Sequence, residues 1–265
     1  MFSRKKELVV AGCSMTANYV KLRNKDPHKI YFLRNPENWE YSEHVWNNIE
    51  EFPTMIDVLA EKYDMKPVNL SVSGSSNEFI FYKAIDYVAE HYKKIDFFSM
   101  HWSNMNRFNT ITTQNNIHRY TSVFAHQNFP AGQRGSHNEL MNAMREIGAF
   151  DVKTKVKEDM RYMFLFQEFM EYYDIPYVQS SNLISTFDGM NGLEVAKIML
   201  ETSYMDNINA SKFWGWPIHY DLGGDHLCNM VDPINQYDKH PNEEGHRQMA
   251  DRLIKFIEKN NLMRK

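Results

Sequence analysis

The sequence contains few cysteines and carries no strong excess of charge of either sign. Its 265 residues include two cysteines, Cys13 and Cys228, and two are too few for a disulfide framework. The net charge is −4, with 24% charged residues, which offers no basic surface to nucleic acid. We therefore expect no nucleic-acid partner and, by default, a reducing cytoplasmic compartment.

Long apolar runs are also missing. No segment approaches the roughly 18–20 apolar residues that cross a bilayer. The start imitates a lipoprotein signal, because residues 3–6 form a basic head and Val10-Ala11-Gly12-Cys13 looks like a lipid-acceptor box. A secretory signal needs an apolar region of about 7–15 residues, whereas only residues 8–11 precede Gly12. The sequence therefore predicts a soluble protein with no membrane partner.

The chain is long enough for one large domain with its own core. Hydrophobic residues make up 43% and aromatic residues 14% of the sequence, and a single core can grow to roughly 250–300 residues. We expect a single domain over residues 1–265, with insertions at about 103–150 and 204–236.

Apolar runs and helical periodicities alternate along the chain. Helical spacing with Ser42 as a cap and Pro53 as a break predicts a helix over 42–64. The other predicted helices are 76–94, 156–173 and 242–259, and the predicted strands are 8–15, 68–72, 95–102 and 175–178. Strands separated by helices favour parallel crossovers, so we predict an α/β fold, a three-layer α/β/α sandwich with a mostly parallel sheet.

Small and polar residues stand where ligands bind in such sheets, beyond the carboxyl ends of the strands. Ser14 and Gly74 follow the first two strands, Asn104 follows the third, and His240 precedes the last helix. Each has an ordinary interpretation as a turn, loop or capping residue. Together they supply what acyl transfer needs: a nucleophile, a base, and donors to the oxyanion from the Ser14 and Gly74 amides and the Asn104 side chain.

The order of these blocks resembles the SGNH (GDSL-like) hydrolases. The four blocks are "VAGCSMT", "VNLSVSGSSN", "DFFSMHWSNMN" and "DKHPNEEGHRQMADRLIKFI", and they cover nearly the whole chain. The resemblance implies Ser14 as nucleophile, Gly74 and Asn104 in the oxyanion hole, and His240 as base with an acid to orient it. It also implies a flavodoxin-like sandwich and hydrolysis of ester or acetyl groups without a metal or other cofactor.

Three positions depart from the pattern of this family. Cys13 replaces the usual Asp before the nucleophile, which also raises a cysteine nucleophile as an alternative. The third block lacks its Gly before Asn104 and its Asp after it, where Met105 stands. The orienting acid, Asp238, lies two residues before His240, with Tyr237 at the usual place; Asp232, Asp225 or no acid at all are the alternatives.

The two insertions carry further candidate features. Residues 103–150 are predicted to be irregular except for a short helical run near 138–147, and to form a lid over the substrate or a subunit contact. The second insertion holds clustered aromatic residues that would either stack on sugar rings or form a small satellite core: Phe213, Trp214, Trp216 and Tyr220. The stretch "HYDLGGDH" at 219–226 matches no zinc or calcium pattern, so we predict no metal site.

Two functions follow from these observations. The first is a serine hydrolase that cleaves an ester or O-acetyl group through an acyl-Ser14 intermediate, with a small-molecule or carbohydrate ester as its partner. The second is an SGNH-fold binding or structural protein with impaired catalysis, including one associated with a virion, and its basis is the altered Cys13, Met105 and Tyr237. The sequence leaves the oligomeric state open.

Overall fold

The central sheet has five parallel strands in the order β2-β1-β3-β6-β7. The structure is a computed structural model that describes residues 6–17, 51–72, 74–105, 107–114, 117–124, 143, 146–147, 151–182, 192–234 and 239–264. The sheet strands are β1 (Glu7–Ala11), β2 (Lys66–Asn69), β3 (Ile95–Trp102), β6 (Tyr177–Ser181) and β7 (Phe213–Trp214). This confirms the predicted α/β fold with a parallel sheet.

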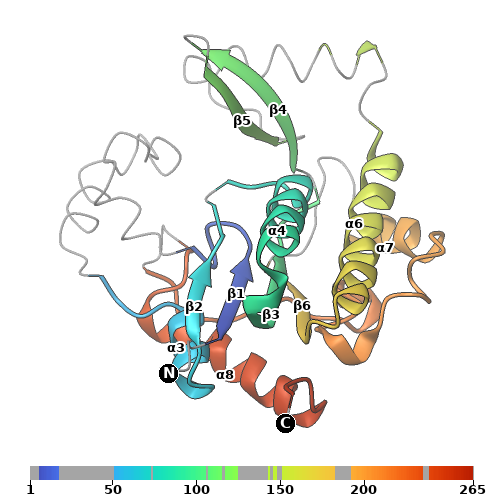
Figure 1. Cartoon of the computed structure of the whole chain (residues 1–265). Helices are drawn as coiled ribbons and strands as arrows, with labels where there is room; N and C mark the ends of the chain where they lie inside the picture. The colour runs from blue at the N-terminus through green and yellow to red at the C-terminus, as the bar shows by residue number, and fades with distance from the viewer. Residues whose placement is uncertain are drawn as a thin grey trace.

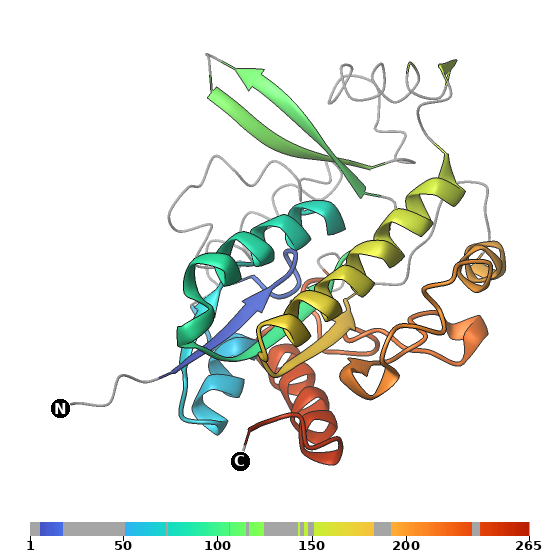
Figure 2. The ribbon, with the colours of Figure 1, turned by 45° about the vertical axis from the view of Figure 1, so that its right-hand side comes forward.

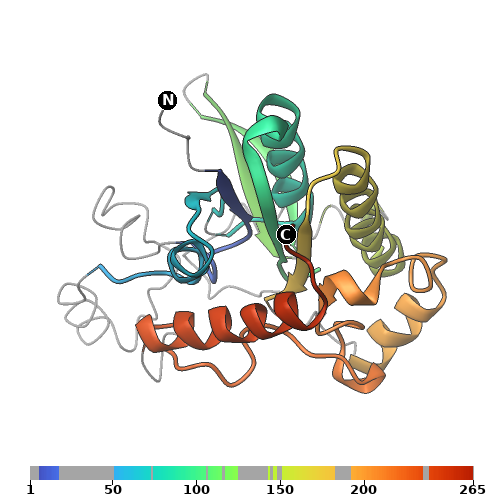
Figure 3. The same ribbon diagram turned by 60° about the horizontal axis from the view of Figure 1, so that its bottom comes forward.

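Helices cover both faces of the sheet. They are α3 (Met55–Lys62), α4 (Asn77–His91), α6 (Val152–Tyr172), α7 (Gly192–Leu200) and α8 (Glu243–Lys259), with short 3-10 turns η4 (Tyr92–Lys94), η5 (Ala210–Lys212) and η6 (Tyr220–Leu222). Figures 1 and 3 show α4 and α6 on one face and α8, with α3 beside it, on the other. Within the described residues, no helix combines the length and apolar character needed to span a bilayer.

The period-two pattern of β1 explains how it joins both halves of the core. Leu8 and Val10 belong to the cluster that packs under α3 and α8. Val9 and Ala11 belong to the larger cluster that packs against α4 and α6. All five residues of β1 are buried, so the strand delivers the residue after it to a fixed place at the carboxyl edge of the sheet.

The predicted boundaries shift at β1, β2 and α3. The first predicted strand, 8–15, ends at Ala11 because the residues after it turn. The predicted strand 68–72 is observed at Lys66–Asn69, with Pro67 inside it, because an edge strand tolerates a residue without an N–H. The helix predicted over 42–64 is observed from Met55, where Thr54 and Asp57 form a capping box, while Ser42 lies outside the described residues.

Three strands and one helix were not predicted from the sequence. Part of the segment predicted as irregular is an antiparallel hairpin, β4 (Arg107–Gln114) and β5 (Ile117–Phe124). Figures 1 and 2 show it projecting beyond the edge to which β1 points. Helix α7 and strand β7 were also missed, and β7 lies inside the second predicted insertion.

Candidate active site

Ser14 lies on a tight turn directly after β1. The amides of Thr16 and Ala17 both donate to the Cys13 carbonyl, at 3.1 Å each, so the chain reverses as soon as the strand ends. Gly12 is required here, because a Cβ at this position would collide with Thr16 Oγ1 and lie 3.1 Å from His101 Cβ. Ser14 is 8% exposed, which leaves its hydroxyl at the edge of the buried region.

His240 is hydrogen-bonded to Ser14, with 2.8 Å between Nε2 and Oγ. The loop that carries His240 is held on both sides. The His240 carbonyl accepts from the Ile234 amide at 2.8 Å, and an antiparallel bridge joins Pro233 to Pro241. Helix α8 begins directly afterwards, capped by Asn242, whose side chain accepts from the Gly245 amide. Ser14 and His240 therefore meet although they are 226 residues apart in the sequence.

The loop after β2 is bonded directly to the Ser14 turn. The Val72 amide donates to the Gly12 carbonyl at 3.1 Å. The Asn69 side chain donates to the Thr16 carbonyl at 3.0 Å, and the Thr16 and Ser71 hydroxyls lie 3.0 Å apart. Gly74 follows with φ of +79°, a left-handed conformation that favours glycine, and the space beside its Cα is open. The loop can thus present the Gly74 backbone to a bound group.

Asn104 lies on the loop after β3, the strand next to β1 in the sheet. The Ser103 amide before it donates to the Asn77 side chain at 2.6 Å, and the Arg107 amide donates to the Asn104 carbonyl at 3.3 Å. Asn104 itself is half-buried. The loops that carry Ser14, Gly74 and Asn104 therefore lie at the carboxyl ends of the neighbouring strands β1, β2 and β3.

Cys13 is fully buried and belongs to the core cluster beneath α4 and α6. Its sulfur accepts from the Asn182 side chain at 3.5 Å. The Arg107 guanidinium also bonds the Cys13 sulfur and donates to the Ser75 carbonyl at 3.3 Å. Burial lowers the pKa of Arg107, an effect that the neighbouring Cys13 opposes. The cysteine thus stands as an acceptor between two buried donors.

The predicted orienting acid, Asp238, lies outside the described residues. Of the two alternatives, Asp225 uses its carboxylate within its own turn, where Oδ1 accepts from the His226 amide at 2.7 Å and the Asn229 side chain at 3.0 Å. Asp232 ties its backbone to the start of α8, since its carbonyl accepts from the Asn242 amide at 3.0 Å. The orienting acid therefore stays a prediction.

The aromatic residues of the second insertion pack inward. Phe213 is buried and contacts the Trp216 ring, with 5.0 Å between centroids. Trp216 packs against the cluster under α4 and α6, and Trp214 against the cluster under α3 and α8. Their packing favours a role in the core over stacking on sugar rings. The core that they join is the main core of the domain, not a separate satellite core. Tyr220 is the exposed member of the set.

The "HYDLGGDH" stretch makes local contacts. His226 Nδ1 lies 3.0 Å from the Asn182 carbonyl, and His219 Nδ1 accepts from the Asp221 amide at 3.4 Å. Across the part of the chain that the structure describes, no group of three or more His, Cys, Asp or Glu side chains is arranged to hold a metal ion.

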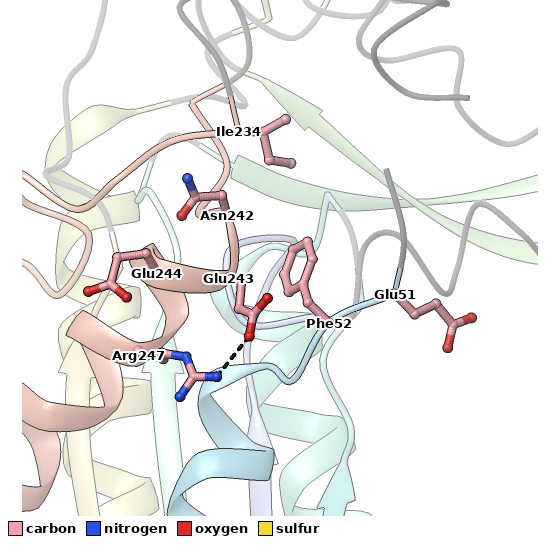
Figure 4. Close-up of a pocket in the computed structure, with 7 residues that line it drawn as sticks. All are labelled: Glu51, Phe52, Ile234, Asn242, Glu243, Glu244 and Arg247. Atoms are coloured by element: carbon pink, nitrogen blue, oxygen red, sulfur yellow. Dashed lines mark hydrogen bonds and ion pairs between the residues drawn. The ribbon is translucent and has the colours of Figure 1, made fainter. Parts of the chain in front are cut away.

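A hollow of about 580 Å³ lies at the start of α8, beside the His240 loop. Figure 4 shows its lining, with Phe52 and Ile234 as the apolar part and Glu243 paired to Arg247 at 2.8 Å. The remaining lining residues are Glu51, Asn242 and Glu244. Because the Ile234 amide bonds the His240 carbonyl, this hollow adjoins the segment that carries the histidine.

Several residues around the site were missed at the level of sequence. The side chains of Asn77, Arg107 and Asn182 each bond a residue next to a predicted site residue. Lys155 and Asp159 form a buried ion pair behind Asn77. Their spacing of four residues within α6 was the available signal, but the same spacing is typical of a solvent-exposed helix pair.

No family model matches the sequence, and no curated protein matches it. Solved structures do match. The psychrotrophic esterase EstA from Pseudoalteromonas sp. is 11% identical, with 96% of this chain and 97% of that chain covered and a TM-score of 0.50. A protein described as a putative lipolytic protein of the G-D-S-L family, from Desulfitobacterium hafniense DCB-2, is 13% identical over 95% and 99% of the two chains, with a TM-score of 0.44.

A catalytic mutant of Axe2, an acetylxylan esterase from Geobacillus stearothermophilus, is 12% identical over 97% and 96% of the two chains, with a TM-score of 0.42. At these levels of sequence identity, structural similarity is evidence about the fold alone. The chain has the α/β fold of EstA along nearly its whole length, so the fold that the four sequence blocks predicted is confirmed.

Proposed function

We propose that this chain is a serine hydrolase that cleaves an ester or O-acetyl group. The observation that carries the proposal is the 2.8 Å contact between Ser14 Oγ and His240 Nε2. A nucleophile and a base within hydrogen-bond reach are the minimum that acyl transfer by serine requires. The shared fold with an esterase supports the same activity class.

The first half of the reaction acylates Ser14. His240 takes the hydroxyl proton as Oγ attacks the ester carbonyl carbon, and the carbonyl oxygen becomes an oxyanion. The Ser14 and Gly74 amides and the Asn104 side chain donate to that oxyanion. When the tetrahedral intermediate collapses, the bond to the alcohol oxygen breaks, and His240 gives its proton to the departing alkoxide.

The second half releases the acid. Water loses a proton to His240 and attacks the acyl carbon, the same donors hold the second oxyanion, and Ser14 leaves as the protonated hydroxyl. In this proposal Asp238 is the acid that orients His240. The substrate is a small-molecule ester, or an acetyl ester carried by a carbohydrate.

Covalent labelling and turnover test this proposal together. Wild-type protein should react with a fluorophosphonate probe and hydrolyse short-chain chromogenic esters, and Ser14→Ala should lose both. Ser211→Ala is the matched control, because Ser211 Oγ bonds Asn209 in the second insertion and its removal should leave labelling unchanged. Absence of labelling and turnover in the wild type, across several acyl lengths, would overturn the enzyme proposal in favour of a binding or structural role.

A further inference from the structure

Asn77 holds the peptide before Asn104 from two sides. Its Oδ1 accepts from the Ser103 amide at 2.6 Å, and its Nδ2 donates to the Ser103 carbonyl at 3.2 Å. Both residues are buried, and Asn77 is the first residue of α4. A side-chain amide that bonds both the N–H and the C=O of one residue replaces the backbone hydrogen bonds that a neighbouring strand would make. It therefore fixes the position of that residue.

A buried ion pair in turn holds Asn77. Asn77 Nδ2 donates to Asp159 Oδ2 at 3.0 Å, while Lys155 Nζ donates to Asp159 Oδ1 at 2.5 Å. Asp159 is 0% and Lys155 6% exposed. The chain of contacts thus begins on α6, passes through the start of α4 and ends on the loop after β3.

The ion pair is costly where it lies, since replacing such a buried pair by apolar residues is often neutral or stabilising. Burial raises the pKa of Asp159 to about 6 even beside the Lys155 ammonium. Stability alone is therefore a weak reason for two charges at this place, and the loop they support through Asn77 carries Asn104.

We propose that Lys155, Asp159 and Asn77 form a positioning relay that holds Asn104 in place to donate to the oxyanion. The relay rests on the proposed function and deepens it. None of its three members is assigned a contact with the substrate; they act through Ser103 and Asn104. They make the loop rigid at Ser103, and so at Asn104, which lies between Ser103 and Met105.

A double-mutant cycle between Asn77→Ala and Asn104→Ala tests the relay, with kcat and KM measured on a short-chain chromogenic ester. Loss of one oxyanion donor typically lowers kcat by about 10²–10³-fold, and we expect that for Asn104→Ala. Asn77→Ala should lower kcat by about 10-fold or more, because small displacements of a catalytic group are costly, and leave KM nearly unchanged. The double variant should have the kcat of Asn104→Ala alone, since Asn77 acts only through Asn104.

Gln167→Ala is the matched control on α6. The Gln167 side chain also bonds a loop from two sides, donating to the Asn207 carbonyl at 3.1 Å and accepting from the Asn209 amide at 2.8 Å. It should lower the melting temperature and leave kcat unchanged. An equal loss of kcat in Gln167→Ala would reduce the Asn77 effect to general destabilisation and overturn the relay.

Two other outcomes also overturn the relay. One is an Asn77→Ala variant with wild-type kcat and a lowered melting temperature. The other is a double variant whose losses multiply. If Asn77→Ala does not fold, the pair Asp159→Leu and Lys155→Met removes both buried charges and the acceptor of Asn77 Nδ2, and it replaces Asn77→Ala in the same cycle with the same expected loss of kcat. An inactive wild type refutes the proposed function and the relay together, whereas an active wild type with an insensitive Asn77 refutes the relay alone.

Discussion

Cys13 connects the turn that carries Ser14 to two buried donors. Asn182 donates to its sulfur at 3.5 Å, and the Arg107 guanidinium bonds it from the first residue of the hairpin. Arg107 also bonds the Ser75 carbonyl, next to Gly74. The thiol therefore accepts hydrogen bonds within the core, at the position where the SGNH hydrolases that the sequence resembles carry a carboxylate.

Cys13→Ala should weaken the fold and spare the nucleophile. It leaves the Asn182 and Arg107 donors facing a methyl group, and an unsatisfied buried polar group costs about 1–3 kcal/mol of unfolding free energy. Denaturant unfolding measures that loss. Because Ser14 and His240 keep their contact, fluorophosphonate labelling should persist in the variant.

Cys228→Ala is the control for removing a thiol. Its sulfur packs against the core cluster under α3 and α8 and donates a weak hydrogen bond to Met249 Sδ at 3.9 Å, so its removal leaves no nitrogen donor without an acceptor and the loss of stability should be smaller than for Cys13→Ala. Labelling that disappears in Cys13→Ala and survives in Ser14→Ala would instead identify the cysteine as the nucleophile.

The sequence could predict Ser14, Gly74, Asn104 and His240 as candidates because each follows a strand or precedes a helix that its own neighbours reveal. It could not predict Asn77, Asp159 or Arg107 in their supporting places. Their contacts join residues separated by 26, 82 and 32 positions, and no local periodicity carries such pairings.

At the scale of elements, the predicted helices and buried strands are those with a clear apolar period. Strand β7 was missed because it has two residues, and two residues show no alternation. Hairpin β4–β5 was missed although both strands contain Thr and apolar residues typical of strands, because those apolar residues do not alternate with polar ones: Phe108 and Ile111 are three positions apart, as are Ile117 and Tyr120. The start of β2 was predicted too late because proline is unfavourable inside a central strand, so the strand was placed after Pro67. An edge strand such as β2 accepts a proline.

Two helix caps allow an effect on stability to be separated from an effect on catalysis. Thr54 caps α3 through a capping box with Asp57, and Asn242 caps α8 two residues after His240. Replacing either by Ala should lower the unfolding free energy by about 0.5–2 kcal/mol. Only Asn242→Ala should also lower kcat, by up to about 10-fold, because it loosens the turn that aims His240 at Ser14.

Chemical denaturation and ester turnover, measured on both variants, check this prediction. Equal kcat in Thr54→Ala and Asn242→Ala would show that the start of α8 does not position His240. A loss of kcat in Thr54→Ala would show that the effect follows overall stability.

At the scale of the whole molecule, two buried histidines set how stability responds to acid. Burial lowers the pKa of His101 to about 3 and that of His246 to about 4. Both are neutral acceptor or donor groups in the fold: His101 lies between the Ser99 and Ser180 hydroxyls, and His246 accepts from the Met55 amide. In the unfolded chain each titrates near pH 6.5, so the unfolded state binds more protons below that pH.

Stability should therefore be highest above pH 6.5 and fall as the pH drops toward 4 and then 3. Asp159 acts in the opposite direction, because its pKa is raised to about 6, but its shift is smaller than the two histidine shifts combined. At about 1.4 kcal/mol per pKa unit, His246 alone contributes roughly 3 kcal/mol to the fall. Urea unfolding of the wild type between pH 7 and pH 4 measures it.

His246→Gln tests the assignment, since the glutamine side chain keeps an acceptor for the Met55 amide and cannot gain a proton in this range. The variant should lose less stability than the wild type between pH 6.5 and pH 4, by up to about 3 kcal/mol. A fall as steep as that of the wild type would mean that the acid sensitivity comes from groups other than the histidine that joins α8 to α3.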